Sequence, residues 1–155
     1  MAQDLKKPHI MLITWFGSGL LKPAPGTWGS LASIPVGVLI YLISGPFGLL
    51  LATAVITIIG TIAIRIFQKE TNTHDLSEIV IDETVGQWIP LAIAGLNPLF
   101  ILLAFILFRF FDITKIWPAN VFDKMTSAWS VMADDIIAGF YAAFVLVLIM
   151  FFTGL

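Results

Sequence analysis

Long apolar stretches alternate with short polar ones along this chain. Uncharged segments run over residues 23–64, 84–108 and 136–155. A helix needs about 20 mostly apolar residues to cross a bilayer, so each stretch is long enough to enter a membrane. The pattern predicts an all-α fold, in which residues 1–155 form one compact helical domain embedded in a membrane.

The first apolar stretch predicts a helical hairpin. The hairpin covers residues 31–64 and follows Phe16–Ser30, where four glycines and two prolines favour a shaped loop over a regular helix. We expect Thr27 or Ser30 to cap a helix that starts near Leu31. That helix should break at Ser44–Gly48, which leaves arms of about 13 and 17 residues, or roughly 20 and 25 Å.

The apolar segment Gln87–Phe108 carries a turn signal, Gly95–Pro98, in its middle. Its halves, about 8 and 10 residues, would reach only roughly 12–15 Å each, which predicts a second, re-entrant hairpin. Asp82 and Asp112 flank this segment and would then share one face of the membrane. With two hairpins all lysines and arginines emerge on one side, the expected cytoplasmic side; they lie within 6–22, 65–69 and 109–124.

The remaining segments are polar, amphipathic or short. A helix is expected to run through the first charges of Arg65–Glu83 and to end at Thr71. Arg109–Lys115 should continue a helix out of the apolar layer. Residues 121–129 form an amphipathic pattern suited to the membrane interface. Residues 136–152 predict a final apolar helix.

Composition supports a membrane protein and excludes several chemistries. Only 12% of residues are charged and the mean hydropathy is +0.99, whereas a soluble domain carries roughly a quarter charged residues. The chain has no cysteine, which excludes disulfides, thiolate metal sites and cysteine nucleophiles. A net charge of −2 argues against a nucleic-acid partner. The first residues show no cleavage pattern, so we expect no signal peptide.

Acidic residues gather where the apolar segments begin or end. The pairs Asp82-Glu83 and Asp134-Asp135 have an ordinary explanation as first-turn charges that favour a helix N-terminus. Asp112 follows a helix, although Arg109 could pair with it one turn away. Together these carboxylates would repel one another unless a hard divalent cation, Mg²⁺ or Mn²⁺, lay among them. The predicted ligands are Asp75, Asp82, Glu83, Asp112, Asp134 and Asp135.

Two cations beside such a site predict phosphate chemistry. Arg109 would supply a bidentate donor and Lys115 a point charge. The turn that contains Gly26, Thr27 and Ser30 could add backbone N–H groups for an anion, although it could equally be a loop that seals the hairpin. The sequence thus predicts a metal-dependent lipid phosphomonoesterase; its predicted catalytic residues are Asp82, Asp112, Arg109 and Lys115.

An ordered set of motifs resembles the phosphatidylglycerophosphatase A family. The motifs cover Phe16 to about Tyr141; they are Phe16-Gly-Ser-Gly19, Pro25-Gly-Thr-Trp-Gly-Ser30, His74-Asp75, Ile79-Val-Ile-Asp-Glu83 with Gly86, Arg109-Phe-Phe-Asp112 with Lys115, and Asp134-Asp-Ile-Ile-Ala-Gly139. The resemblance implies an Mg²⁺-dependent enzyme of the bacterial inner membrane that converts phosphatidylglycerophosphate to phosphatidylglycerol and phosphate. The chain departs from the family pattern at Ile116, where proline is usual, and at 126–130, where glycines are usual.

Two other classes of protein compete with the phosphatase. A small cation transporter or channel would also use membrane carboxylates, but it predicts acidic residues distributed through the apolar segments. A membrane assembly factor without catalytic activity is the second alternative. Within the phosphatase hypothesis, attack by a metal-activated water is favoured over a phospho-aspartyl intermediate, although the sequence does not separate them. The sequence does not give the oligomeric state.

Overall fold

Helices form every regular element of the computed structural model, which describes residues 5–73 and 77–154. No strand occurs in these two ranges, which confirms the all-α prediction. The elements are α1 (Pro8–Ile13), the 3-10 helix η1 (Ser18–Leu20), α2 (Pro25–Thr71), α3 (Ile81–Ala94), α4 (Pro98–Thr114), α5 (Ala119–Phe122) and α6 (Ala128–Thr153).

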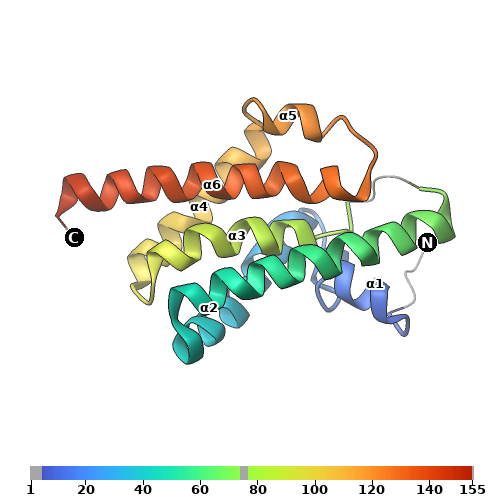
Figure 1. Ribbon diagram of the computed structural model, residues 1–155, viewed down its shortest axis with the longest axis horizontal. Helices are drawn as coiled ribbons and strands as arrows, with labels where there is room; N and C mark the ends of the chain where they lie inside the picture. The colour runs from blue at the N-terminus through green and yellow to red at the C-terminus, as the bar shows by residue number, and fades with distance from the viewer. Residues whose placement is uncertain (1–4, 74–76, 155) are drawn as a thin grey trace.

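Helix α2 is a hairpin of two arms, as predicted. The chain reverses at Gly45, whose φ of 68° and ψ of −171° lie in a region open mainly to glycine. Figure 1 shows the two arms folding back on each other, with the second running toward the end where α3 begins. The second arm ends at Thr71 as expected, and Asn72 closes it in a left-handed conformation with φ of 51°.

The start of α2 corrects the predicted loop. The helix begins at Pro25, six residues before the expected Leu31, and Ala24 is its N-cap without a side-chain hydrogen bond. Neither Thr27 nor Ser30 is therefore the N-cap. Proline suits the first position of a helix because its φ is already helical and its missing N–H is not needed there. The following glycines and serine are incorporated into the first turns, where the Ser30 hydroxyl donates to the carbonyl of residue 26 at 2.8 Å.

Helices α3 and α4 form the second predicted hairpin. Gly95 turns the chain with a φ of 62°, and the Asn97 side chain accepts a hydrogen bond from the Leu99 amide at 2.9 Å. The helices are longer than the predicted halves because they extend into the polar flanks, back to Ile81 and on to Thr114. The start of α3 and the end of α4 consequently lie at the same end of the molecule. Entry of this hairpin into a membrane from one side stays a prediction.

The C-terminal part also differs from the prediction. No helix runs through 121–129, because α5 ends at Phe122 and Ser127 then caps α6 by accepting from the Ser130 amide at 3.1 Å. Helix α6 therefore starts eight residues earlier than expected. Asp134 and Asp135 lie beyond its first turn, so the helix-start explanation for this pair is wrong.

The central element of the fold is α3, which packs between α2 and α6. Eleven of its fourteen residues are buried, so it is a core helix rather than a lipid-facing one. Its contact with α6 is close because glycines face each other: a Cβ on Gly139 would overlap the Gly86 carbonyl, and one on Gly86 would overlap the Phe108 ring. On the opposite side the Trp88 indole donates to the Ser33 carbonyl at 3.0 Å.

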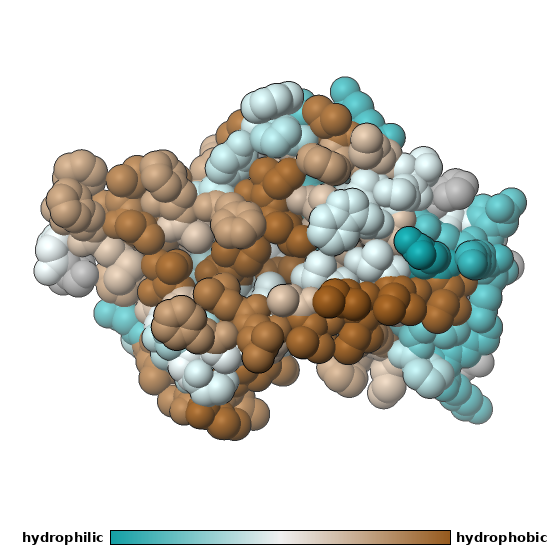
Figure 2. Space-filling model, in the orientation of Figure 1, coloured by the Kyte–Doolittle hydropathy of each residue, from teal (hydrophilic) through white to brown (hydrophobic). Residues whose placement is uncertain are grey.

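The outer surface is that of a membrane domain. By length and composition, two helices in the described part of the chain, α2 and α6, are able to cross a bilayer. Large apolar side chains are exposed on them, including Phe47 at 85% and Phe152 at 79%. Figure 2 shows apolar residues over most of the visible face and hydrophilic residues gathered at one end. The charged layer is thus separated from the apolar body, as the sequence predicts.

Candidate functional site

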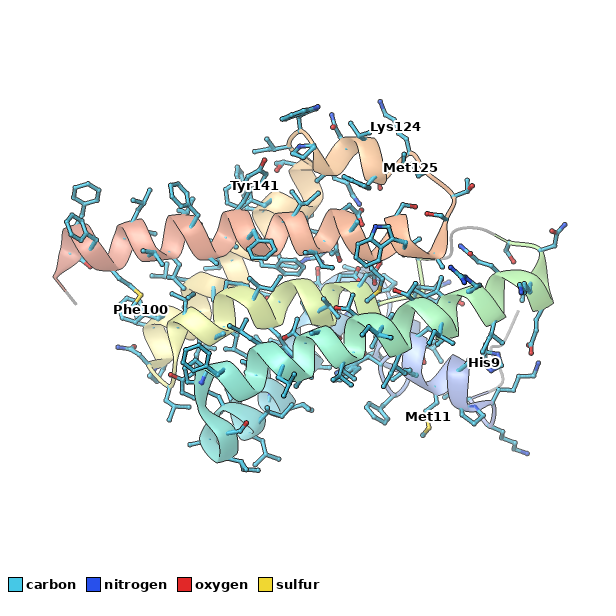
Figure 3. The ribbon with its side chains drawn as sticks, viewed as in Figure 1. His9, Met11, Phe100, Lys124, Met125 and Tyr141 are labelled. Carbon is cyan, nitrogen blue, oxygen red and sulfur yellow. The ribbon has the colours of Figure 1, made fainter. Side chains whose placement is uncertain are left out.

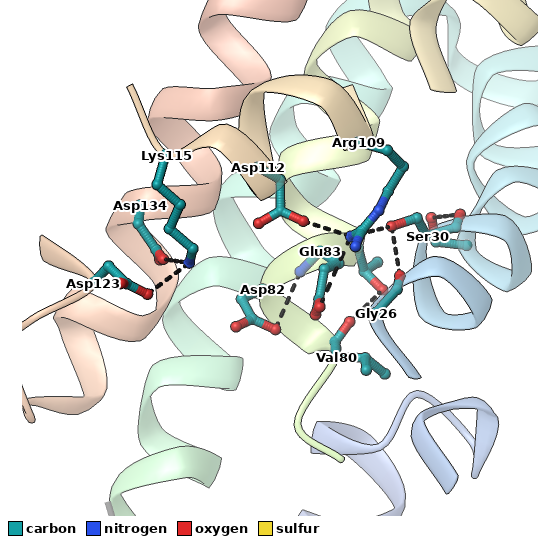
Figure 4. Close-up of polar contacts among 12 residues, drawn as sticks. Gly26, Ser30, Val80, Asp82, Glu83, Arg109, Asp112, Lys115, Asp123 and Asp134 are labelled. Atoms are coloured by element: carbon teal, nitrogen blue, oxygen red, sulfur yellow. Dashed lines mark hydrogen bonds and ion pairs between the residues drawn. The ribbon is translucent and has the colours of Figure 1, made fainter. Parts of the chain in front are cut away.

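The helix ends at the hydrophilic end of the fold enclose a cavity of about 460 Å³. Its walls come from the starts of α2 and α3, the end of α4, the first half of α6 and the segment after α5. Most of the predicted site residues line it; these are Gly26, Asp82, Glu83, Arg109, Asp112, Lys115, Asp134 and Asp135. All of them except Asp135 are labelled in Figure 4. The structure therefore places Asp82 and Asp112 in the same cavity, while their position relative to a membrane stays a prediction.

Among the described residues, three carboxylates of the cavity converge on one point. One oxygen each from Asp82, Glu83 and Asp135 lies within 4.8 Å of the others. We call these residues the carboxylate triad. The Glu83 backbone amide donates to Asp82 Oδ1 at 3.1 Å, which orients that side chain at the start of α3. Glu83 Oε2 is buried and has no hydrogen-bond partner among the described residues. Three negative groups that converge on one point are a suitable oxygen donor set for Mg²⁺ or Mn²⁺.

The electrostatics of the triad also fit a bound cation. Asp82 and Glu83 lie at the start of α3, outside the two helices that are long enough to cross a membrane. Burial, followed by repulsion from Glu83, raises the pKa of Asp82 well above its usual range. Burial also raises the pKa of Glu83 to about 8, although hydrogen bonding with Asp82 opposes this shift. Asp82 and Glu83 therefore resist being ionised at the same time unless a cation binds beside them.

Two other predicted ligands are paired with cations. Arg109 Nη1 lies 2.6 Å from Asp112 Oδ2, and Lys115 Nζ lies 2.5 Å from Asp134 Oδ2. Asp112 thus forms the ordinary ion pair with Arg109, one helical turn before it, which the sequence leaves open as an alternative to metal binding. Asp75 falls among residues 74–76, outside the described ranges. Metal binding by Asp112, Asp134 and Asp75 stays a prediction.

Lys115 joins three elements at the cavity wall. It ends α4 in a left-handed conformation, with φ of 44°, so it does not continue the helix as expected. Its ammonium contacts Asp134 of α6 and Asp123, at 2.7 Å, after α5. Burial alone would lower the pKa of Lys115, but hydrogen bonds to Asp123 and Asp134 more than offset this and raise it. Lys115 is therefore a permanent positive charge beside the triad.

Arg109 connects the triad to the start of α2. Its Nη1 lies 3.9 Å from Glu83 Oε1 and donates to the Ser30 hydroxyl at 3.3 Å. Gly26 leaves the space for this contact, because a Cβ there would overlap the Glu83 carboxylate. Of the predicted anion-binding turn, Gly26 lines the cavity and Ser30 contacts Arg109, whereas Thr27 does not line the cavity.

The segment that follows α4 completes the wall. Asp123, Lys124 and Met125 line the cavity from this segment. Figure 3 labels Lys124 and Met125, which lie near the start of α6. It is tethered to α6 by the Tyr141 hydroxyl, which donates to the Trp117 carbonyl at 2.8 Å. The sequence gives no signal for these residues as cavity residues, because the amphipathic pattern around them predicts an interfacial helix.

Gln87 is the other residue that the sequence interpretation missed. It is fully buried one turn beyond Glu83 on α3, and neither Oε1 nor Nε2 has a hydrogen-bond partner among the described residues. The available signal was its spacing of four from Glu83, which places both on one side of a helix.

The fold and the cavity define an all-α membrane protein with clustered carboxylates, an arginine and a lysine at one polar end. Residues 11–150 match the family model described as phosphatidylglycerophosphatase A. The chain belongs to the phosphatidylglycerophosphatase A family, and it is a phosphatase.

Curated relatives agree with this assignment. A phosphatidylglycerophosphatase A of Haemophilus influenzae is 42% identical and covers 92% of this chain and 88% of its own length. A phosphatidylglycerophosphatase A of Escherichia coli is 35% identical, with coverage of 92% and 83%. A protein of Bacteroides thetaiotaomicron described as a putative phosphatidylinositol-3-phosphatase is 34% identical, with coverage of 89% and 92%. No solved structure matches the chain.

Proposed function

We propose that this phosphatase hydrolyses phosphatidylglycerophosphate to phosphatidylglycerol and phosphate, with Mg²⁺ as its cofactor, at the membrane surface. The main support is the position of the carboxylate triad next to Arg109 and Lys115 in one cavity. The names of two relatives supply the substrate. The cation-transporter alternative is disfavoured because the buried carboxylates lie at one end of the fold rather than along the apolar helices.

The carboxylate triad would hold the metal ion. Its donors are all oxygens, and the unpartnered Oε2 of Glu83 fits an additional ligand. Mn²⁺ has similar ligand preferences and is expected to substitute. A bound divalent ion supplies positive charge to the phosphate oxygens and lowers the pKa of a nearby water.

Arg109 and Lys115 would bind the phosphate from the other side of the cavity. Asp112 holds the guanidinium at 2.6 Å, while Asp123 and Asp134 hold the lysine ammonium. Both cations are thereby fixed before substrate arrives. Fixed charges stabilise the negative charge that develops on the phosphoryl oxygens, because little reorganisation is needed during the reaction.

The reaction would proceed by displacement at phosphorus. A water oxygen bonds to the terminal phosphorus as the bond from phosphorus to the glycerol oxygen breaks, roughly in line. The leaving oxygen keeps the bonding electron pair and takes a proton, which gives the glycerol hydroxyl of phosphatidylglycerol. The proton lost by water leaves with phosphate or passes to solvent.

Phosphate release by the purified protein in detergent micelles tests this proposal. Release from phosphatidylglycerophosphate is expected to stop in EDTA and to return when Mg²⁺ is added in excess, because the triad alone cannot neutralise the phosphate. Undiminished release in EDTA would refute the metal requirement. Turnover of phosphatidylinositol 3-phosphate with none of phosphatidylglycerophosphate would refute the substrate.

The apolar body would place the site at the cytoplasmic face of the bacterial inner membrane. Hydrophilic residues gather at one end (Figure 2), and the lysines and arginines lie in the polar intervals 6–22, 65–69 and 109–124, which favours the cytoplasm for that end. The natural chain has no cysteine, so single cysteines can be introduced at the exposed Thr73 and Met125. We expect an impermeant thiol reagent to label both in inverted membrane vesicles and neither in right-side-out vesicles. Labelling of the two positions from opposite sides would contradict the re-entrant hairpin.

A further inference from the structure

Gln87 is an unusual residue to find in the core of this helix bundle. Its side chain is fully buried within α3, and both of its polar atoms lack hydrogen-bond partners in the ranges that the structure describes. Burying an amide without partners costs free energy, so an apolar residue would stabilise this position more. A buried amide here therefore calls for a reason other than packing.

Two polar groups of the site, Glu83 and Arg109, have unsatisfied atoms that are complementary to those of Gln87. Glu83 precedes Gln87 by one helical turn, a spacing that brings side chains together on the same side of a helix. Its Oε2 is a buried acceptor without a donor, and Arg109 Nε is a buried donor without an acceptor. Arg109 also lies beside Glu83, with 3.9 Å between Nη1 and Oε1.

The helix that carries Arg109 is in contact with α3 at this level. Gly86, the residue before Gln87, faces the Phe108 ring so closely that a Cβ on it would overlap the ring. The Arg109 guanidinium carbon lies 5.9 Å from the centre of the same ring. Gln87 is thus at the height where α3 meets the base of Arg109.

We propose that Gln87 is a positioning residue that links the metal-binding and phosphate-binding halves of the site, an inference that rests on the proposed function. The four atoms concerned make no hydrogen bond to the described residues in this structure; in the metal-bound protein, Gln87 Nε2–H donates to Glu83 Oε2 and Gln87 Oε1 accepts from Arg109 Nε–H. A carboxamide offers a donor and an acceptor on one planar group, which neither a carboxylate nor a hydrocarbon provides. Gln87 thereby orients one carboxylate of the triad and the guanidinium together, without adding charge.

The test compares wild type with Gln87→Met, which keeps the volume and removes both hydrogen bonds. The first readout is thermal unfolding titrated with Mn²⁺, which reports metal binding without turnover. Loss of a group that orients a metal ligand typically weakens metal affinity 10–100-fold, so the Mn²⁺ concentration for half-maximal stabilisation should rise by about that factor. The unfolding temperature without metal should stay the same or rise. The value of kcat/KM should fall by a similar factor.

A matched control tests whether removing any buried polar side chain has the same effect as removing the Gln87 amide. Thr57→Val removes a buried hydroxyl of α2 that donates to the Thr53 carbonyl at 2.8 Å, away from the cavity. This variant should keep the wild-type Mn²⁺ midpoint and kcat/KM. In the Glu83→Gln background, Gln87→Met should no longer shift the midpoint, because the carboxylate on which the amide acts is gone.

Each outcome decides the role of Gln87. A wild-type Mn²⁺ midpoint in Gln87→Met would overturn the proposal, as would an equal shift in Thr57→Val. If Gln87→Met does not fold, Gln87→Leu serves in its place, and failure of both to fold would assign Gln87 to packing alone. A wild-type protein without any response to Mn²⁺ or Mg²⁺ would instead refute the proposed metal site.

Discussion

Asp82→Asn is expected to lower kcat for phosphate release at least about 1,000-fold while leaving the protein folded. The amide has the shape of the carboxylate but no charge, so the triad loses one of its three negative groups. A metal ion contributes several kcal/mol of charge stabilisation to such reactions, and about 4 kcal/mol corresponds to a factor of 1,000. The metal-free protein should become more stable, because folding must either protonate Asp82 or bury it charged beside other carboxylates, and asparagine requires neither.

Phosphate release at saturating substrate and thermal unfolding without metal would be measured side by side. Glu70→Gln is the matched control, because it also converts an acid to its amide but lies in an exposed ion pair with Lys7, 2.7 Å long. This control should keep wild-type turnover. An Asp82→Asn enzyme with activity close to that of wild type would rule out Asp82 as a metal ligand.

Arg109→Lys is expected to reduce kcat/KM about 100-fold, the usual cost of losing one fixed donor to a developing oxyanion. Lysine keeps the positive charge, so Asp112 keeps a partner and the fold should persist. In the wild type, Nη1 contacts Asp112 and Ser30 and lies near Glu83, which leaves the other guanidinium nitrogens for the phosphate, whereas lysine has a single nitrogen. The loss should therefore come from geometry rather than from charge.

Steady-state kinetics of Arg109→Lys and Arg65→Lys in the same micelles would measure this loss. Arg65 is exposed on α2, away from the cavity, so the same substitution there should leave kcat/KM unchanged. Equal activity of the two variants would show that a point charge at position 109 is sufficient, and the bidentate role would then be wrong.

The hairpins could be predicted from sequence because backbone requirements mark them. Gly45 and Gly95 adopt positive φ values in the structure, and each interrupts an apolar run that otherwise reads as one long helix. Those turns were enough to place Asp82 and Asp112 at the same end. The first residue of each helix was harder to predict, because the pattern of apolar residues indicates which positions are buried but not which residue caps the helix. Pro25 and Ser127 begin helices inside segments that look like loops by composition.

The inner arrangement of the site could not be predicted. Asp134 and Asp135 are neighbours in sequence, but a step of about 100° around a helix sends them to different partners. One pairs with Lys115 and the other joins the triad, and only the packing of α6 on α3 decides which. Gln87 was missed for a related reason: a buried polar residue inside an apolar helix is informative only once its surroundings are known.

The close contact of Gly86 with Gly139 inside the apolar body fixes how far apart α3 and α6 lie in the charged layer. The span from Asp82 and Glu83 across to Asp135 is set by two backbones that touch inside the bundle, not by the loops at its mouth. A bulkier residue at either glycine would separate α3 from α6 and widen the triad without touching a charged group. The spacing of the triad therefore depends on two positions one turn below the cavity that carry no side chain.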